Sequence, residues 1–361
     1  MQSKKVFKNN CITYGIVIAA YLIVQLFVMG GKVSNLMQGL LVPLCVYAIL
    51  AVSLNLTVGI LGELSLGHAG FMCVGAFTGA FFSKCMQTAI PVTFVRFTLA
   101  ILVGAVCAGL FGLLIGIPVL RLKGDYLAIV TLAFGEIIKN VINVLYIGRD
   151  SSGFHFSVNS AAELNLAEDG EVLIKGAQGI TGTPNDSTFT VGIVLLLITL
   201  FIVLNLIHSR DGRAIMAIRD NVIAAESVGI NVTKYKLMAF SISAALAGVA
   251  GVLYAHNLST LIALPKNFGY NMSIMILVFV VLGGIGNIRG SVISAVVLTM
   301  LPELLRGLRD YRMLIYAVVL IAMMLFNWAP KCVEWRKKYS MILGKYLRRF
   351  KKQKTDAKEA E

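Results

Sequence analysis

Long apolar stretches repeat along the chain, and short polar segments separate them. Each stretch is close to the roughly 20 residues that an α-helix needs to cross a bilayer. A backbone in hydrocarbon must satisfy its own hydrogen bonds, which a helix does. The pattern therefore predicts an all-α polytopic membrane protein with about ten transmembrane helices. The stretches lie near residues 12–29, 37–60, 64–83, 98–119, 126–147, 189–207, 237–257, 270–288, 291–305 and 312–328.

Two of these stretches are less regular than the others. The stretch at 64–83 begins in a glycine-rich sequence, and the stretch at 291–305 is short and runs into Pro302 and Glu303. Irregular backbone is tolerated at membrane depth only where protein or a water-filled cavity surrounds it. Both segments are therefore candidates for broken or re-entrant helices.

The first apolar stretch follows a basic start with Lys4, Lys5 and Lys8, an arrangement that resembles a signal peptide. The stretch is long for a signal-peptide core, and no small-x-small cleavage site follows it. We expect this helix to remain in the protein.

The composition agrees with a lipid environment, and the distribution of basic residues indicates which segments face the cytoplasm. The chain has 361 residues, of which 58% are hydrophobic and 14% charged, and its mean hydropathy is +0.82. The net charge of +14 is concentrated after Lys331, without the aromatic and basic pattern of a nucleic-acid platform. Cytoplasmic segments of membrane proteins carry excess Lys and Arg. We therefore expect no nucleic-acid partner, a transmembrane domain at 1–330, a basic cytoplasmic tail at 331–361, and both termini in the cytoplasm.

Two polar connections are long enough to have a role. The outer loop at 148–188 is acidic and has no long apolar stretch, so we expect it to be exposed. The loop at 208–236 falls on the cytoplasmic side and is basic.

The cytoplasmic loop contains an amphipathic pattern. Apolar side chains recur there at helical spacing, charges of both signs flank them, and no Trp or Phe anchor for a lipid surface is present. This favours one helix at 213–228 that docks on a partner protein, with Gly229 ending it and Thr233 capping the next helix. The stripe consists of Ile215, Ile218, Val222 and Ala225.

Motifs for catalysis are missing from the sequence. There is no G-x-x-x-x-G-K-[ST] phosphate loop, so we expect ATP to be hydrolysed on separate subunits and no cofactor to be bound by this chain. The cysteines form no CxxC pair and the four histidines are scattered, so we expect no metal site and no catalytic residue.

Polar residues at membrane depth are the candidates for a substrate pathway, because burying them is costly. They are Gly62, Glu63, Gly67, His68 and Glu136. Two interpretations stay open. The glycine-rich stretch either packs helices tightly, as the small-xxx-small spacing of Gly75 with Gly79 and of Gly112 with Gly116 indicates, or its bend opens helix ends to a cavity where free N–H groups meet a substrate carboxylate. Similarly, Glu63 and His68 lie either in the pathway or at the cytoplasmic end of the bend, and Glu136 is either a substrate contact or the ion-pair partner of Lys139.

Five sequence blocks resemble the integral-membrane permeases of branched-chain amino acid ATP-binding cassette (ABC) importers. The blocks are L-N-L-T-V-G-I-L-G-E-L-S-L-G-H-A-G-F at 54–71, R-L-K-G-D-Y-L-A-I-V-T-L-A-F-G-E-I-I at 121–138, R-D-G-R-A-I-M-A-I-R-D-N-V-I-A-A-E-S-V-G-I-N at 210–231, A-L-A-G-V-A-G-V-L-Y-A-H at 245–256, and V-L-G-G-I-G-N-I-R-G at 281–290. They occur in a consistent order over most of 50–305.

The resemblance implies a permease domain in the bacterial cytoplasmic membrane that moves Leu, Ile or Val inward. It implies as partners two ATPase subunits, a second related permease, an extracytoplasmic substrate-binding protein and membrane lipid. It also implies that the loop at 208–236 holds a coupling helix, which seats in the ATPase. The coupling residues expected there are Arg213, Ile218, Arg219, Asp220, Ala224, Ala225, Glu226 and Gly229.

The outer turn Thr181–Asn185 resembles a T-G-G-x-N turn of this family, with Thr183 in place of a glycine. Three alternatives remain: an ABC permease for another solute such as a sugar, a secondary transporter driven by an ion gradient, and an intramembrane enzyme. The motifs favour amino acids over sugars, and the polar groups at membrane depth are too few to favour an enzyme.

Overall fold

The computed structural model describes residues 2–31, 34–122, 124–151, 153–167, 170–305, 307 and 311–328. The chain divides into two compact units, Met1–Met300 and Leu301–Glu361. The second unit contains the helix α13 (Arg312–Trp328). The expected basic tail at 331–361 lies outside the described residues.

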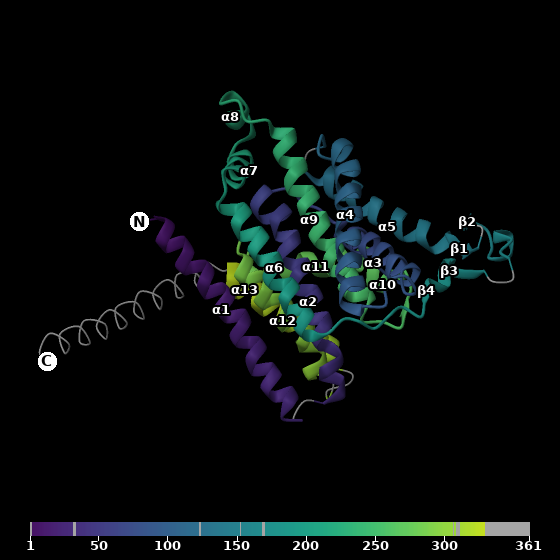
Figure 1. The fold of residues 1–361 in the computed structure, drawn as a ribbon. Coiled ribbons are helices and arrows are strands. Elements are labelled where there is room, and N and C mark those ends of the chain that lie inside the picture. Colours follow the sequence, from purple (N-terminus) through teal and green to yellow (C-terminus); the bar gives the residue numbers. More distant parts are fainter. Residues whose placement is uncertain are drawn as a thin grey trace, which may run out of the picture. The chain divides into compact units, whose positions relative to one another are not determined.

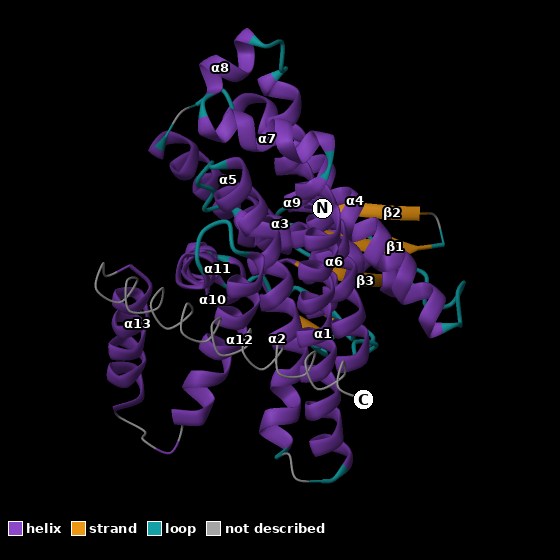
Figure 2. Ribbon diagram, turned by 90° about the vertical axis from the view of Figure 1, so that its left-hand side faces the viewer, coloured by secondary structure: helices purple, strands orange, loops and turns teal. Residues whose placement is uncertain are grey.

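Long helices make up most of the first unit, and two views show them gathered into a bundle (Figures 1 and 2). Their bounds are α1 (Gln2–Met29), α2 (Asn35–Asn55), α3 (His68–Cys85), α4 (Thr93–Val119), α5 (Asp125–Val144), α6 (Phe189–His208), α7 (Arg210–Asp220), α8 (Val222–Ser227), α9 (Val232–Ala255), α10 (Pro265–Phe268), α11 (Tyr270–Gly283) and α12 (Ile288–Leu304).

Seven helical segments among the described residues are long and apolar enough to cross a membrane. They are α1, α2 with its extension to Leu61, α4, α5, α6, α9, and α10 together with α11. The chain is therefore a polytopic helical membrane protein, but the expected count of about ten is not confirmed. Helix α3 has polar residues at its ends, His68 and Lys84, and α12 and α13 have only 17 residues each.

Helix α9 lies at the centre of the bundle, where it packs against α2, α3 and α4. Glycines allow this close approach. A Cβ atom added at Gly75 would lie 2.3 Å from the Cα atom of Gly248, and one added at Gly112 would lie 2.6 Å from the Cβ atom of Ala244. Small residues at helix contacts let backbones approach where no hydrophobic effect drives association. The tight packing predicted from the small-xxx-small spacing is confirmed.

The glycine-rich bend is a break between two helices. Helix α2 continues into a buried π-helix, η1 (Leu56–Leu61), which ends at Gly62. Gly62 has φ +83°, a conformation that glycine adopts without steric cost. The chain is then non-helical until α3 begins at His68. The sequence predicted a broken segment here, although it placed the start of the helix at residue 64.

The loop at 148–188, which we expected to face outward, is a folded β-structure, and this corrects the expectation of an all-α chain. Strand β1 pairs in antiparallel fashion with β2 on one side and β3 on the other. Ile147, Leu164 and Leu173 are buried beneath the sheet. Two short strands, β4 and β5, form a second pair. The bounds are β1 (Tyr146–Asp150), β2 (Gly153–Ser157), β3 (Glu171–Lys175), β4 (Ile180–Thr181), β5 (Thr260–Leu261), and the 3₁₀ turns η2 (Ala162–Leu164) and η3 (Gly176–Gln178).

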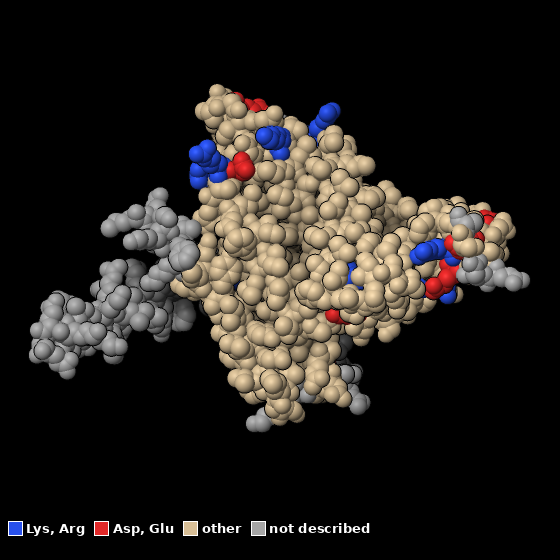
Figure 3. Space-filling view, viewed as in Figure 1, with Lys and Arg blue, Asp and Glu red and all other residues tan. Residues whose placement is uncertain are grey.

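Exposed charged side chains cluster in two places on the face drawn in Figure 3. Most of the Lys, Arg, Asp and Glu there lie around α7 and α8 and around the β1–β3 sheet, and much of the remaining surface is uncharged. A wide uncharged surface suits contact with lipid, because charged side chains are costly in hydrocarbon.

Candidate functional site

The loop at 208–236 folds into two helices, so the single helix predicted at 213–228 is wrong. Ser209 caps α7 by accepting a hydrogen bond from the Gly212 N–H at 3.0 Å. Asn221 then adopts an extended conformation with φ −160° and caps α8, its Oδ1 accepting from the Ala224 N–H at 3.0 Å. An asparagine cap can begin a new helix inside an apparently continuous pattern.

The end of α8 matches the prediction for Gly229. This glycine has φ +84°, which favours glycine, and its N–H donates to the Glu226 carbonyl at 2.9 Å. The cap of α9 is Asn231, whose Oδ1 accepts from the Lys234 N–H at 3.0 Å. Thr233 is therefore not the cap.

The predicted apolar stripe is divided between two faces. Ile215 and Ile218 are buried against the rest of the chain, and Ile215 belongs to a cluster formed with η1 and α9. By contrast, Ile223 and Val228 are 80% and 74% exposed. Figure 1 shows α8 at the tip of the first unit, beyond the ends of the long helices. The exposed apolar side chains there are Ile223 and Val228, which sequence reasoning missed, and the predicted Val222, which is 38% exposed.

The other predicted coupling residues differ in burial. Ala225 is buried. The exposed members are Arg213, Asp220, Ala224, Glu226 and Gly229.

Arg219 points partly inward and joins α7 to η1. Its Nη1 donates to the carbonyl of Gly59 at 3.1 Å. Its Nε and Nη2 donate to Oδ1 of Asp220 at 3.0 and 2.9 Å. Helix α7 is thereby linked directly to the broken helix.

The predicted pathway residues at the start of the break have partners within the chain. Gly62 lies against the stem of Arg219, since an added Cβ would be 2.6 Å from its Cγ. Glu63 forms an ion pair with Lys236 of α9. Both side chains of this pair are mostly buried.

His68 and Gly67 lie deeper in the bundle. The Ser53 hydroxyl donates to the Leu50 carbonyl at 2.9 Å, so its oxygen accepts from Nε2–H of His68 at 2.7 Å. A Cβ atom at Gly67 would lie 2.2 Å from the Thr131 carbonyl oxygen. The backbone of the break is thus packed directly on α5.

The start of α3 already has hydrogen-bond acceptors for two of its N–H groups. The Ala69 N–H donates to the Ser273 hydroxyl at 3.1 Å, and the Gly70 N–H donates to the Gly67 carbonyl at 2.9 Å. In this conformation, those two donors are occupied.

Glu136 has the ion pair with Lys139 that the structural interpretation predicts. Its Oε1 also accepts from the Tyr270 N–H at 2.7 Å, which connects α5 to the start of α11. Among the predicted pathway residues, Gly67 packs on α5 and Glu136 belongs to α5, whereas Gly62 and Glu63 contact α7 and α9.

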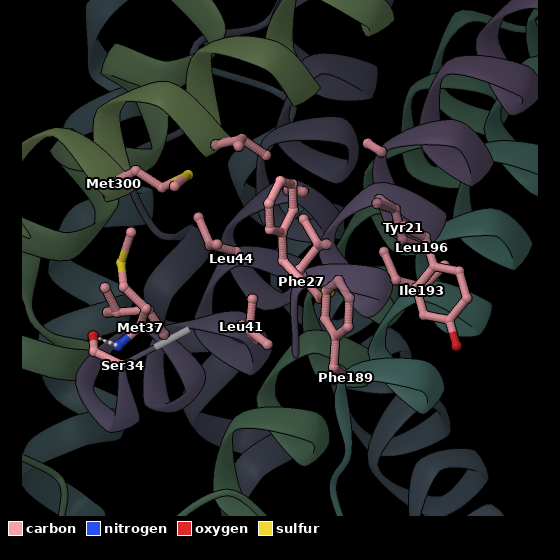
Figure 4. A pocket seen from close by; sticks show the side chains of 16 residues that line it. Tyr21, Phe27, Ser34, Met37, Leu41, Leu44, Phe189, Ile193, Leu196 and Met300 are labelled. Carbon is pink, nitrogen blue, oxygen red and sulfur yellow. Dashed lines mark hydrogen bonds between the residues drawn. The ribbon is translucent and has the colours of Figure 1, made fainter. Parts of the chain in front are cut away.

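A pocket of about 480 Å³ lies between α1, α2, α6 and α12. Phe27 and Phe189 project into it, and Ser34 stands at its edge with its hydroxyl accepting from the Met37 N–H (Figure 4). None of the described residues that line it is charged. A zwitterion needs charged or strongly polar partners when it leaves water, so this pocket suits hydrocarbon and not a free amino acid.

A family of known permeases matches residues 36–326, and it is described as the permease component of branched-chain amino acid transport systems. The chain belongs to this family. It is 35% identical over 305 residues to the high-affinity branched-chain amino acid transport system permease protein LivM of Salmonella typhimurium, covering 79% of this chain and 67% of that protein. It is 33% identical over 299 residues to LivM of Escherichia coli, with the same coverage. It is also 26% identical over 212 residues to the autoinducer 2 import system permease protein LsrC of Yersinia enterocolitica, covering 52% of this chain and 58% of that protein. No solved structure matches.

Thr183 lies in the turn that resembles a family motif, and the structure shows what its side chain contacts. The Thr183 side chain is buried, and its hydroxyl donates to the Leu258 carbonyl. The N–H groups of Gly182 and Thr183 both donate to the Ser259 carbonyl, at 3.0 and 3.3 Å. The added side chain therefore anchors the turn to the segment after α9 and does not extend outward.

A buried ion pair near this outer turn was not predicted from the sequence. Nη2 of Arg96, on α4, donates to Oδ2 of Asp186 at 3.0 Å, and both side chains are almost fully buried. The next residue, Ser187, donates its N–H to the His256 carbonyl at 3.4 Å. In this permease, the outer ends of α4 and α9 are thereby tied to the segment that enters α6.

Proposed function

We propose that this permease is the membrane subunit of an ABC importer that carries branched-chain amino acids inward across the bacterial cytoplasmic membrane. Membership of the family of branched-chain amino acid permeases supports the substrate class. The observation that carries the coupling to ATP is the exposed apolar tip of α8, formed by Ile223 and Val228 at the end of a cytoplasmic segment.

The exposed tip fits a protein partner better than a lipid surface. Its two large apolar side chains are surrounded by exposed polar residues, including Glu226 and Ser227. A small apolar centre with a polar rim is the usual anatomy of a protein interface. We assign the partner as an ATPase subunit, which supplies the phosphate-binding loop that the sequence lacks.

The orientation follows from the charges near α7, α8 and the start of α9. Cytoplasmic connections retain Lys and Arg, so we place this basic end in the cytoplasm, together with the basic segments near both termini. The basic residues there are Arg210, Arg213, Arg219, Lys234 and Lys236. The β1–β3 sheet then faces the outside, where a substrate-binding protein delivers its cargo.

In the proposed mechanism, closure of two ATPases displaces α7 and α8 and thereby changes the packing of the membrane helices. A second related permease forms the other half of the pathway. The binding protein supplies selectivity, so the pathway itself needs only a weak passing site. ATP is bound and hydrolysed by the ATPase subunits, and we expect this chain to bind no cofactor.

Transport by the complete assembly tests this function. Proteoliposomes that contain this chain, its second permease and the ATPases, supplied with the binding protein, are expected to accumulate labelled leucine only when ATP is present. Unlabelled isoleucine and valine should compete, whereas ribose and autoinducer 2 should not. Uptake that continues without ATP and collapses with a protonophore would identify a secondary transporter instead.

A further inference from the structure

The coupling segment contacts the break in two ways, through the apolar packing of Ile215 against η1 and through one long polar side chain. Arg219 lies near the end of α7, and Gly59 lies inside η1, 160 positions away in the sequence. The side chain of Arg219 is only 36% exposed, because its stem runs along Gly62. The guanidinium group thus spans from the surface of α7 to a buried helix end.

The contact supplies a hydrogen-bond donor to a terminal carbonyl group of η1. The last carbonyl groups of a helix have no partner within that helix. A cation at this end is also favoured by the helix dipole. Since η1 ends at Gly62, the Gly59 carbonyl is one of these terminal acceptors, and Arg219 donates to it from outside the helix.

The same turn of η1 is in close contact with a second glycine-rich loop. A Cβ atom at Gly59 would lie 2.4 Å from the backbone nitrogen of Gly286. Asn55, just before η1, accepts from the Gly286 N–H at 2.8 Å and donates to the Ser291 hydroxyl at 2.7 Å. A shift of η1 therefore has to move the connection between α11 and α12 as well.

We propose that Arg219 is a positioning residue that makes η1 follow α7, so that a displacement of the coupling segment reaches the break at Gly62 and the loop at Gly286. This proposal rests on the proposed function, since it assumes that an ATPase moves α7 and α8. Asp220 holds the guanidinium group in place through its Oδ1 atom. Arg219 acts within the chain, and the docking contact itself belongs to Ile223 and Val228.

The test uses the complete transporter in proteoliposomes and measures leucine uptake together with ATP hydrolysis. In Arg219→Ala, the ATPase subunits should still co-purify in normal amount, and the number of leucine molecules moved per ATP should fall. The fall should be about 5- to 150-fold, the usual range for energetic coupling between two sites. Arg219→Lys, which keeps the charge but loses the planar fork, should lie between wild type and alanine. Arg210→Ala, on the exposed start of the same helix, is the matched control and should keep the wild-type ratio.

Three results would overturn the proposal. One is a normal ratio of leucine to ATP in Arg219→Ala, and another is loss of the ATPase subunits from that variant, which would make Arg219 a docking residue. The third applies if Arg219→Ala does not fold: the proposal is then tested with Arg219→Lys, and a wild-type number of leucine molecules per ATP in that variant contradicts it. Failure of the proposed function is separate, because it appears as ATP-independent uptake by the wild-type assembly.

Discussion

ATP-driven uptake is expected to be lost when Ile223 is replaced by glutamate, while the chain still inserts and folds. Ile223 is 80% exposed, and exposed positions tolerate substitution with changes in folding free energy usually within about 0.5 kcal/mol. A charge placed at the centre of a docking contact, however, typically costs more than about 2 kcal/mol of binding free energy. Uptake and co-purification of the ATPases should therefore fail together.

The matched control is Ile223→Leu, which keeps an apolar side chain of the same volume and should retain both uptake and assembly. The exposed Val228, replaced by glutamate, should reproduce the loss. Wild-type uptake by Ile223→Glu would show that the tip of α8 is not the docking surface.

The second large effect is expected at the outer end of the bundle. Replacing Arg96 with alanine leaves the Asp186 carboxylate buried without its cation. Breaking a buried ion pair in this way costs about 3–5 kcal/mol of folding free energy, because the remaining charge is uncompensated. The variant should therefore unfold at a clearly lower temperature than the wild-type protein in detergent.

The double variant Arg96→Ala with Asp186→Ala separates this cause from a general loss of packing. Removing both charges removes the uncompensated carboxylate, so the double variant should be more stable than Arg96→Ala alone. Equal unfolding temperatures for the two variants would contradict the argument.

Much of the membrane architecture is predictable from periodicity and small residues. The apolar stretches gave most of the long helices, and Gly75 and Gly112 lie in the close contacts that their spacing predicts. The bend ending at Gly62 was also expected to be irregular. These features depend on the length of the apolar stretches and on side-chain volume, and both can be read from the sequence.

The outer sheet shows where this reasoning fails. Its strands are only five residues long, and polar turns interrupt them, so no apolar stretch marks the fold. The buried position of Asp150 depends on partners from other segments, including the N–H of Ala167 at 3.3 Å. Long-range contacts of this kind leave no local signal.

The sequence predicted which residues form the coupling segment but not how that segment folds. The stripe through Ile215, Ile218, Val222 and Ala225 assumes a continuous helix, and the break at Asn221 turns the later residues to another face. Asparagine is a strong helix cap, so Asn221 before an apolar run is the signal that would have revealed α8. Arg219 carries no such signal, because its partner at Gly59 is distant in sequence.

The most direct test of the account is the sidedness of the α8 tip, measured with a membrane-impermeant thiol reagent on Val228→Cys in a chain whose native cysteines are replaced by serine. In inside-out vesicles the reagent should label this cysteine, and assembly with the ATPase subunits should protect it. Labelling from the outside of intact cells, or unchanged labelling in the assembled transporter, would contradict the account.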